Sequence, residues 1–180
     1  MFAIRSTTAT ARLGGVCYLL TIVTGMAGEL VPAPVWASTL ATLLSFGFYG
    51  GVTWYLYRLF APTNRPLAGL AAGSSLLGCA LGVLKALALT SIPLSSLVFF
   101  GFYCVLTGYL IWRSRLLPPW LGGLLAVSGL GWLTFLSPQF AHSLAPYHLV
   151  SGLVGEGALT LWLLLGRIAR PEEAVPETAS

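Results

Sequence analysis

The sequence has very little charge. Its 180 residues include no Asp and a single Lys, Lys85, and charged residues make up only 8% of the chain. Soluble domains carry about 25% charged residues. Because 57% of the residues are hydrophobic, the polar side chains cannot cover a soluble globule of this size. The composition therefore excludes an ordinary soluble domain and indicates that lipid is the solvent.

Cysteine is also scarce. Cys17, Cys79 and Cys104 lie in separate apolar runs, and their spacing excludes both a disulfide framework and a cysteine metal motif. The net charge is +4, but the arginines occur in short clusters between long uncharged runs, so they form no basic face for nucleic acid. We expect no cofactor, no metal and no nucleic-acid partner. The expected partner is the lipid bilayer.

Long apolar stretches dominate what is present. A membrane-spanning helix needs about 17 to 25 mostly apolar residues, and Pro, Arg or polar residues separate six such stretches. We predict helices over residues 13–31, 35–59, 67–90, 94–112, 120–136 and 149–168. The predicted fold is all-α, a six-helix transmembrane bundle. It has a cytoplasmic N-terminal segment (residues 1–12), a transmembrane domain (13–168) and a cytoplasmic tail (169–180).

The arginines predict the orientation, because Lys and Arg near membrane helices are retained on the cytoplasmic side. They lie before the first predicted helix, around the loops between helices two and three and between helices four and five, and at the end of the sixth helix. The other three loops contain no arginine. The eight are Arg5, Arg12, Arg58, Arg65, Arg113, Arg115, Arg167 and Arg170. Both termini are therefore predicted to be cytoplasmic, in a multi-pass protein of the cell (inner) membrane.

Small residues mark the faces expected to point inward, since helices in lipid associate through close packing and hydrogen bonds. Tyr18 and Glu29 belong to such a stripe on the first helix. The third helix has two small-xxx-small pairs, residues 69 to 73 and residues 78 to 82, all four glycines. The Gly-rich faces also offer a surface through which copies of the chain could form a homo-oligomer.

Three ionisable side chains lie inside predicted helices, in the outer half. At about 1.5 Å per residue, Glu29 lies near the outer surface, Lys85 about 8 Å below it and Glu156 about 12 Å below it. An intramembrane ionisable residue is a functional-site hypothesis by default. The shared depth of an acid, a base and a second acid on three helices favours one outward-facing pocket.

Each of the three also has a structural explanation. Glu29 could end the first helix in the headgroup region, and Lys85 could extend its stem outward to the interface. Glu156 could pair with Lys85 as a clamp, or stay protonated and hydrogen-bonded.

His142 and His148 lie in or beside the last outer loop. A loop histidine is usually solvated, and a metal site would need further ligands. The candidate ligand-binding residues are Glu29, Lys85, Glu156, Tyr18 and His148. No residue stands out as catalytic.

Several ordered motifs resemble a bacterial membrane family. They are Arg12-Leu-Gly-Gly-Val-Cys-Tyr18-Leu-Leu with Gly25 and Glu29, Tyr57-Arg58-Leu59 with Pro62, Gly108-Tyr109-Leu110 through Arg113, Leu116, Leu117 and Pro118, Gly122 to Leu133, and Gly155-Glu156 with Leu161-Trp162-Leu163-Leu164. These residues, spread over nearly the whole chain, resemble the proteins grouped as domain of unknown function 4386. The resemblance implies a six-helix membrane protein in which Glu29 and Glu156 match acidic positions of the first and last helices. Lys85 has no such counterpart, and the resemblance implies no reaction or substrate.

Three functions fit these observations. The leading hypothesis is an ion- or small-ligand-handling membrane protein with an outward-facing intramembrane pocket. The second is an intramembrane enzyme acting on a lipid or isoprenoid, with Glu156 as general acid or base, although no nucleophile or metal motif supports it. The third is a structural or accessory bundle in which Lys85 and Glu156 only pair.

Overall fold

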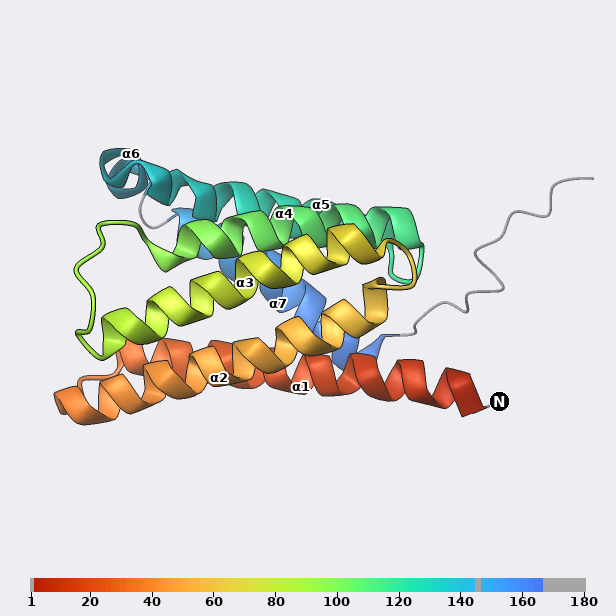
Figure 1. The fold of residues 1–180 in the computed structure, drawn as a ribbon, viewed down its shortest axis with the longest axis horizontal. Coiled ribbons are helices and arrows are strands. Elements are labelled where there is room, and N and C mark those ends of the chain that lie inside the picture. Colours follow the sequence, from red (N-terminus) through yellow and green to blue (C-terminus); the bar gives the residue numbers. More distant parts are fainter. Residues whose placement is uncertain (1, 145–146, 167–180) are drawn as a thin grey trace, which may run out of the picture.

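A computed structural model describes residues 2–144 and 147–166, apart from the side chains of residues 2–6, 138 and 148–149 (Figure 1). The predicted all-α class is confirmed, since the described residues form helices and no strand. The long helices are α1 (Phe2–Leu30), α2 (Val35–Phe60), α3 (Arg65–Ala86), α4 (Ser96–Ser114), α5 (Pro119–Leu133) and α7 (Tyr147–Leu165). Between α5 and α7 lie a 3-10 turn, η1 (Thr134–Leu136), and a short helix, α6 (Pro138–Ser143).

Local sequence signals define the helix ends. Pro34 precedes α2, and Asn64 caps α3 by accepting a 3.1 Å hydrogen bond from the backbone N–H of Leu67. The Ser95 side chain caps α4 in the same way. A capping oxygen satisfies one of the N–H groups that the first helical turn leaves without a partner. The polar and proline punctuation therefore terminates and restarts the helices near the predicted positions.

Two predicted helix bounds differ most from the structure. The first helix begins at Phe2 rather than residue 13, because residues 2–13 contain no Gly or Pro to stop it. The third ends at Ala86 rather than residue 90. There Ala88 adopts a left-handed conformation, with φ of 54°, which helices commonly use to terminate.

The six long helices form a closed ring. Each packs against its neighbours in the order α1, α2, α3, α4, α5, α7, and α7 closes the ring against α1. The α2–α3 and α4–α5 connections lie at the same end as the N-terminus of α1 (Figure 1). The arginine-bearing connections therefore share one end, as predicted. The assignment of that end to the cytoplasm remains a prediction, and Arg167 and Arg170 lie outside the described residues.

Among the described residues, five helical segments are long and apolar enough to cross a membrane. They are Thr7–Leu30, Val35–Phe60, Arg65–Ala86, Ser96–Ser114 and Pro119–Leu136. A sixth apolar segment, Val150–Leu165, is shorter. Large apolar side chains such as Leu70, Leu130 and Leu161 are exposed on the outside of the bundle, as a lipid environment requires. The structure thus supports a multi-pass membrane protein, and the sixth span remains a prediction.

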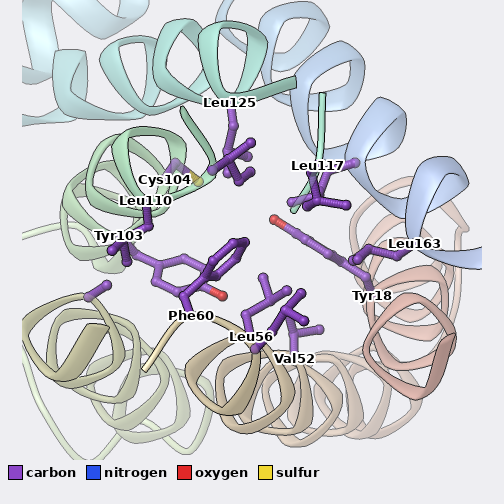
Figure 2. Packing of buried hydrophobic residues seen from close by; sticks show 14 of the residues in the cluster. Tyr18, Val52, Leu56, Phe60, Tyr103, Cys104, Leu110, Leu117, Leu125 and Leu163 are labelled. Atoms are coloured by element: carbon purple, nitrogen blue, oxygen red, sulfur yellow. The ribbon is translucent and has the colours of Figure 1, made fainter. Parts of the chain in front are cut away.

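Aromatic residues and glycines build the interior. Figure 2 shows Tyr18, Phe60 and Tyr103 directed into the space that the helices enclose. Helices α4 and α5 approach closely where glycines face each other, since a Cβ on Gly108 would lie 2.5 Å from the carbonyl oxygen of Gly122. Small residues permit such close backbone approach.

The two predicted glycine pairs of α3 behave differently. Gly78 packs on the ring of Phe100, and Gly82 packs on the ring of Phe46. Gly69 and Gly73 have no neighbouring atom within 4 Å of a Cβ position in the described part of the chain. The Gly78–Gly82 pair is therefore an internal contact as predicted, whereas the Gly69–Gly73 pair faces outward, so the prediction for that pair was wrong.

Candidate functional site

The candidate residues fall into two places. Tyr18 and Glu156 meet in the ring, whereas Glu29 and Lys85 lie at the end of the bundle opposite the arginine-bearing connections. The side chain of His148 lies outside the described residues.

The carboxyl group of Glu156, on α7, contacts side chains of three other helices. Its Oε2 accepts a 2.9 Å hydrogen bond from the hydroxyl of Tyr18 on α1. Its Oε1 accepts a 2.7 Å bond from Nε1 of Trp132 on α5, and Sγ of Cys104 on α4 lies 4.0 Å from the same oxygen. We define Tyr18, Cys104, Trp132 and Glu156 as the carboxyl cluster.

Close packing holds the two donors in place. The Trp132 ring lies directly on Gly152, one turn before Glu156, where a Cβ would occupy the space of the indole. Tyr18 is fully buried, and its ring packs edge-to-face on Tyr49 with centroids 5.7 Å apart. Because both donors are positioned by their rings, the carboxyl oxygens meet a preformed pair of N–H and O–H groups.

Backbone contacts position Glu156 itself. A Cβ on the preceding Gly155 would lie 2.6 Å from the carbonyl oxygen of Leu124 and 2.7 Å from Cβ of Ser128. Helix α7 therefore approaches α5 as closely as its backbone allows at this turn. The missing side chain at residue 155 is what permits the neighbouring carboxyl group to reach Trp132.

The donors to Glu156 are neutral. Among the described residues, no Lys, Arg or His side chain contacts its carboxyl group. Nζ of Lys85 instead donates a 2.6 Å bond to the carbonyl oxygen of Leu94. The hypothetical Lys85–Glu156 pair is therefore absent from this structure. The ring order explains this, because α3 packs between α2 and α4 and α7 packs between α5 and α1, placing the two helices across the ring (Figure 1).

A groove of about 490 Å³ opens between the ends of α1, α2, α3 and α4. Glu29 and Lys85 both line it and both are exposed. Hydroxyl groups supply further polar lining, and they belong to Ser38, Thr39, Thr42 and Ser96. Glu156 is not part of the groove lining, so the expectation of one pocket shared by the three ionisable groups was wrong.

Aromatic rings lie between the groove and the carboxyl cluster. Phe46 lines the groove and stacks on Phe100, with centroids 6.2 Å apart. The ring of Phe100 contacts the ring of Tyr49, with centroids 4.5 Å apart, and the ring of Tyr49 contacts that of Tyr18. The two candidate sites are thus separate but joined by a continuous series of ring contacts.

Sequence reasoning missed Trp132 as a site residue. A Trp within an apolar helix carries an N–H group that needs a partner when it is buried, and this was the available signal. Within the described ranges, no three His, Cys, Asp or Glu side chains gather in a way that could hold a metal ion. His142 is an exposed residue of α6.

Comparison with known families supports part of the resemblance. The family described as Domain of unknown function (DUF4386) matches residues 92–166. This segment includes Trp132 and Glu156, so the resemblance is confirmed over α4 to α7. The motifs of residues 12–62, including Glu29, lie before the matched segment, and there the resemblance remains a prediction. No curated protein and no solved structure matches the chain.

Proposed function

We propose that this chain is a multi-pass protein of the bacterial cell membrane that binds a small zwitterionic ligand in its groove. The presence of Glu29 and Lys85 in one groove of about 490 Å³ carries this proposal. Small-molecule pockets commonly measure about 300 to 1,000 Å³. A ligand with one anionic and one cationic group would satisfy both side chains without leaving a net charge in the groove.

The chemistry of Lys85 supports an anionic group on the ligand. Its ammonium group has three N–H donors, and the carbonyl oxygen of Leu94 accepts one of them. The other two are available to a phosphate or carboxylate oxygen, and lysine is a common phosphate ligand. The contact with Leu94 also restrains the flexible stem of the lysine. The ammonium group is therefore partly preorganised for an anion.

Glu29 supports a cationic group on the same ligand. Its carboxylate is exposed in the groove, where it can accept hydrogen bonds from an ammonium group. Thr42 donates its hydroxyl hydrogen to the carbonyl oxygen of Ser38 at 2.9 Å, so the Thr42 oxygen keeps lone pairs for a donor on the ligand. Both a zwitterionic lipid headgroup and a free amino-acid-like molecule have this chemistry.

Binding measurements on the purified, reconstituted protein test the proposal. The probes are phosphatidylethanolamine in nanodiscs for the lipid source, and phosphoethanolamine and glycine for the soluble source. We expect one source to bind, and Lys85→Ala and Glu29→Gln each to weaken binding about tenfold, which corresponds to about 1.4 kcal/mol. His142→Ala is the matched control, because His142 is exposed and does not line the groove. Failure of every probe to bind, or equal binding by all variants, would overturn the proposal.

The proposal also assigns the groove to the outer side of the membrane. The arginine-bearing connections occupy the other end of the bundle (Figure 1), and arginine loops are retained in the cytoplasm. The test is cysteine labelling in a variant lacking Cys17, Cys79 and Cys104. An impermeant maleimide should label Ser96→Cys in intact cells and Arg65→Cys only after permeabilisation. The reverse pattern would contradict the orientation with both termini inside.

A further inference from the structure

The carboxyl cluster contains an acid whose partners among the described residues are neutral side chains. We propose that Glu156 is a proton-binding site within the bundle, and that the hydroxyl hydrogen of Tyr18 turns from Glu156 to Tyr49 when the proton binds. The site is separate from the groove and does not depend on a ligand there. Its occupant is the proton itself, carried on Oε2 of Glu156.

The surroundings of Glu156 favour a proton over a permanent negative charge. An ionised carboxylate within a membrane helix costs at least about 2.5 kcal/mol unless it is compensated. Its donors in the described part of the chain, Tyr18, Trp132 and the more distant Cys104, are all neutral. Among the described residues, the titratable groups close enough to interact with it electrostatically are Tyr18 from α1, Tyr49 from α2, and Tyr103 and Cys104 from α4. None of these described groups is a cation that could compensate a negative charge on Glu156. Binding a proton therefore neutralises the carboxyl group.

The same contacts disfavour a metal cation as the occupant. The indole N–H of Trp132 points at Oε1, and an indole nitrogen is a donor only. The hydroxyl hydrogen of Tyr18 points at Oε2. Two positions around the carboxylate are thus filled by hydrogens. A proton can bind without displacing either side chain.

Two buried hydroxyl groups make the rearrangement possible. The hydroxyls of Tyr49 and Tyr103 have no hydrogen-bond partner among the residues that the structure describes, although Tyr49 is only 5% exposed and Tyr103 only 2%. An unpaired buried polar group is costly, and the edge-to-face contacts of Tyr49 bring it against both Tyr18 and Tyr103. The Tyr49 hydroxyl, which belongs to the ring packed on Tyr18, can accept a hydrogen that Tyr18 withdraws from Glu156.

The proton step then balances without another reactant. A proton from solvent binds Oε2, and the new O–H group donates to the hydroxyl oxygen of Tyr18. The hydroxyl hydrogen of Tyr18 turns from Glu156 to the oxygen of Tyr49. Trp132 continues to donate to Oε1. Loss of the proton reverses each change, and no covalent bond other than the carboxyl O–H forms or breaks.

Infrared difference spectra between acidic and alkaline buffer test the proposal on the full chain in lipid. We expect the wild-type protein to show a protonated-carboxyl C=O band that disappears at alkaline pH. Glu156→Gln should lack this band. Glu173→Gln, which removes an acid near the C-terminus of the sequence, should retain it. Tyr18→Phe should retain the band to higher pH, with proton affinity raised about tenfold, because the carboxylate has lost one of its donors.

Two results would overturn the inference. One is a carboxyl region that is identical in wild-type protein and Glu156→Gln at every pH. The other is a Tyr18→Phe protein in which neither the frequency of the band nor its pH dependence changes. Because Tyr18→Phe keeps the buried ring, it allows the test even where Glu156→Gln fails to fold. Ligand binding in the groove is measured separately, so the two proposals can fail independently.

Discussion

The carboxyl cluster and the groove begin from the same sequence feature, an ionisable residue in an apolar helix, but they have opposite surroundings. Both oxygens of Glu156 accept hydrogen bonds from side chains of other helices. Glu29 and Lys85 are exposed in an open groove. The first site is therefore built by packing within the protein, whereas the second is completed by whatever enters from outside.

This difference follows from where each residue lies in the ring. Glu156 lies within α7, where Gly152 and Gly155 bring α5 close enough for Trp132 to donate. Glu29 and Lys85 lie in the last turns of α1 and α3. The two sites therefore differ both in position along the helix and in the tightness of the neighbouring contacts. Perturbing those contacts is therefore the way to test the distinction.

The largest effect is expected at Gly155. In Gly155→Ala the new Cβ would meet the Leu124 carbonyl oxygen at 2.6 Å, and the backbone there cannot move as a side chain would. We expect the free energy of unfolding in detergent to fall by about 3 kcal/mol, the upper end for overpacked sites. Denaturant titration followed by circular dichroism measures it.

Gly157→Ala is the matched control on the same turn of α7. Its Cβ position has no atom within 4 Å among the described residues, so the change should be neutral or stabilise the helix by about 0.5 to 1 kcal/mol through propensity. Equal destabilisation by the two alanines would show that the carboxyl cluster does not depend on the close approach of α5 and α7.

A smaller effect is expected from the two tyrosines that pack against each other. In alkaline buffer, Tyr18→Phe removes a hydrogen bond to Glu156 and should lower the free energy of unfolding by about 1 to 2 kcal/mol. Tyr49→Phe removes a hydroxyl with no partner in the described part of the chain and should be neutral or stabilising. Thermal unfolding of the two variants side by side measures the difference. A larger loss of stability in Tyr49→Phe than in Tyr18→Phe would show that the Tyr49 hydroxyl, rather than the bond from Tyr18 to Glu156, stabilises the carboxyl cluster.

Much of the fold could be predicted because its signals are local. Proline, asparagine and serine at the helix ends, and arginine at alternate connections, act within one or two turns of their own position. These signals predicted the bounds of α2, α4, α5 and α7 to within a few residues. The start of α1 was missed because a polar sequence without a helix breaker can continue a helix beyond its apolar part.

The arrangement of the site could not be predicted in the same way, because it depends on ring order. Glu156 and Lys85 have opposite charge and were predicted at similar depth, yet Lys85 lies in the last turn of α3 and α3 and α7 lie across the bundle. Nothing in the α7 sequence specifies that Trp132 rather than Lys85 faces Glu156. Likewise, the glycine pairs of α3 have the same spacing, and only the positions of Phe46 and Phe100 make one pair internal.

The smallest expected effect lies at the rim of the groove, where α3 ends beside Lys85. Ala88 has a φ of 54°, and its backbone N–H donates to the carbonyl oxygen of Lys85 at 2.9 Å. A left-handed residue at a helix end favours glycine, so Ala88→Gly should raise the free energy of unfolding by about 0.5 to 1 kcal/mol. Ala86→Gly, within the last turn, should lower it by a similar amount. Thermal unfolding with the groove empty measures both changes. Opposite signs would show that local backbone geometry holds this end of the groove, in contrast to the interhelical packing that holds Glu156, whereas equal signs would contradict that contrast.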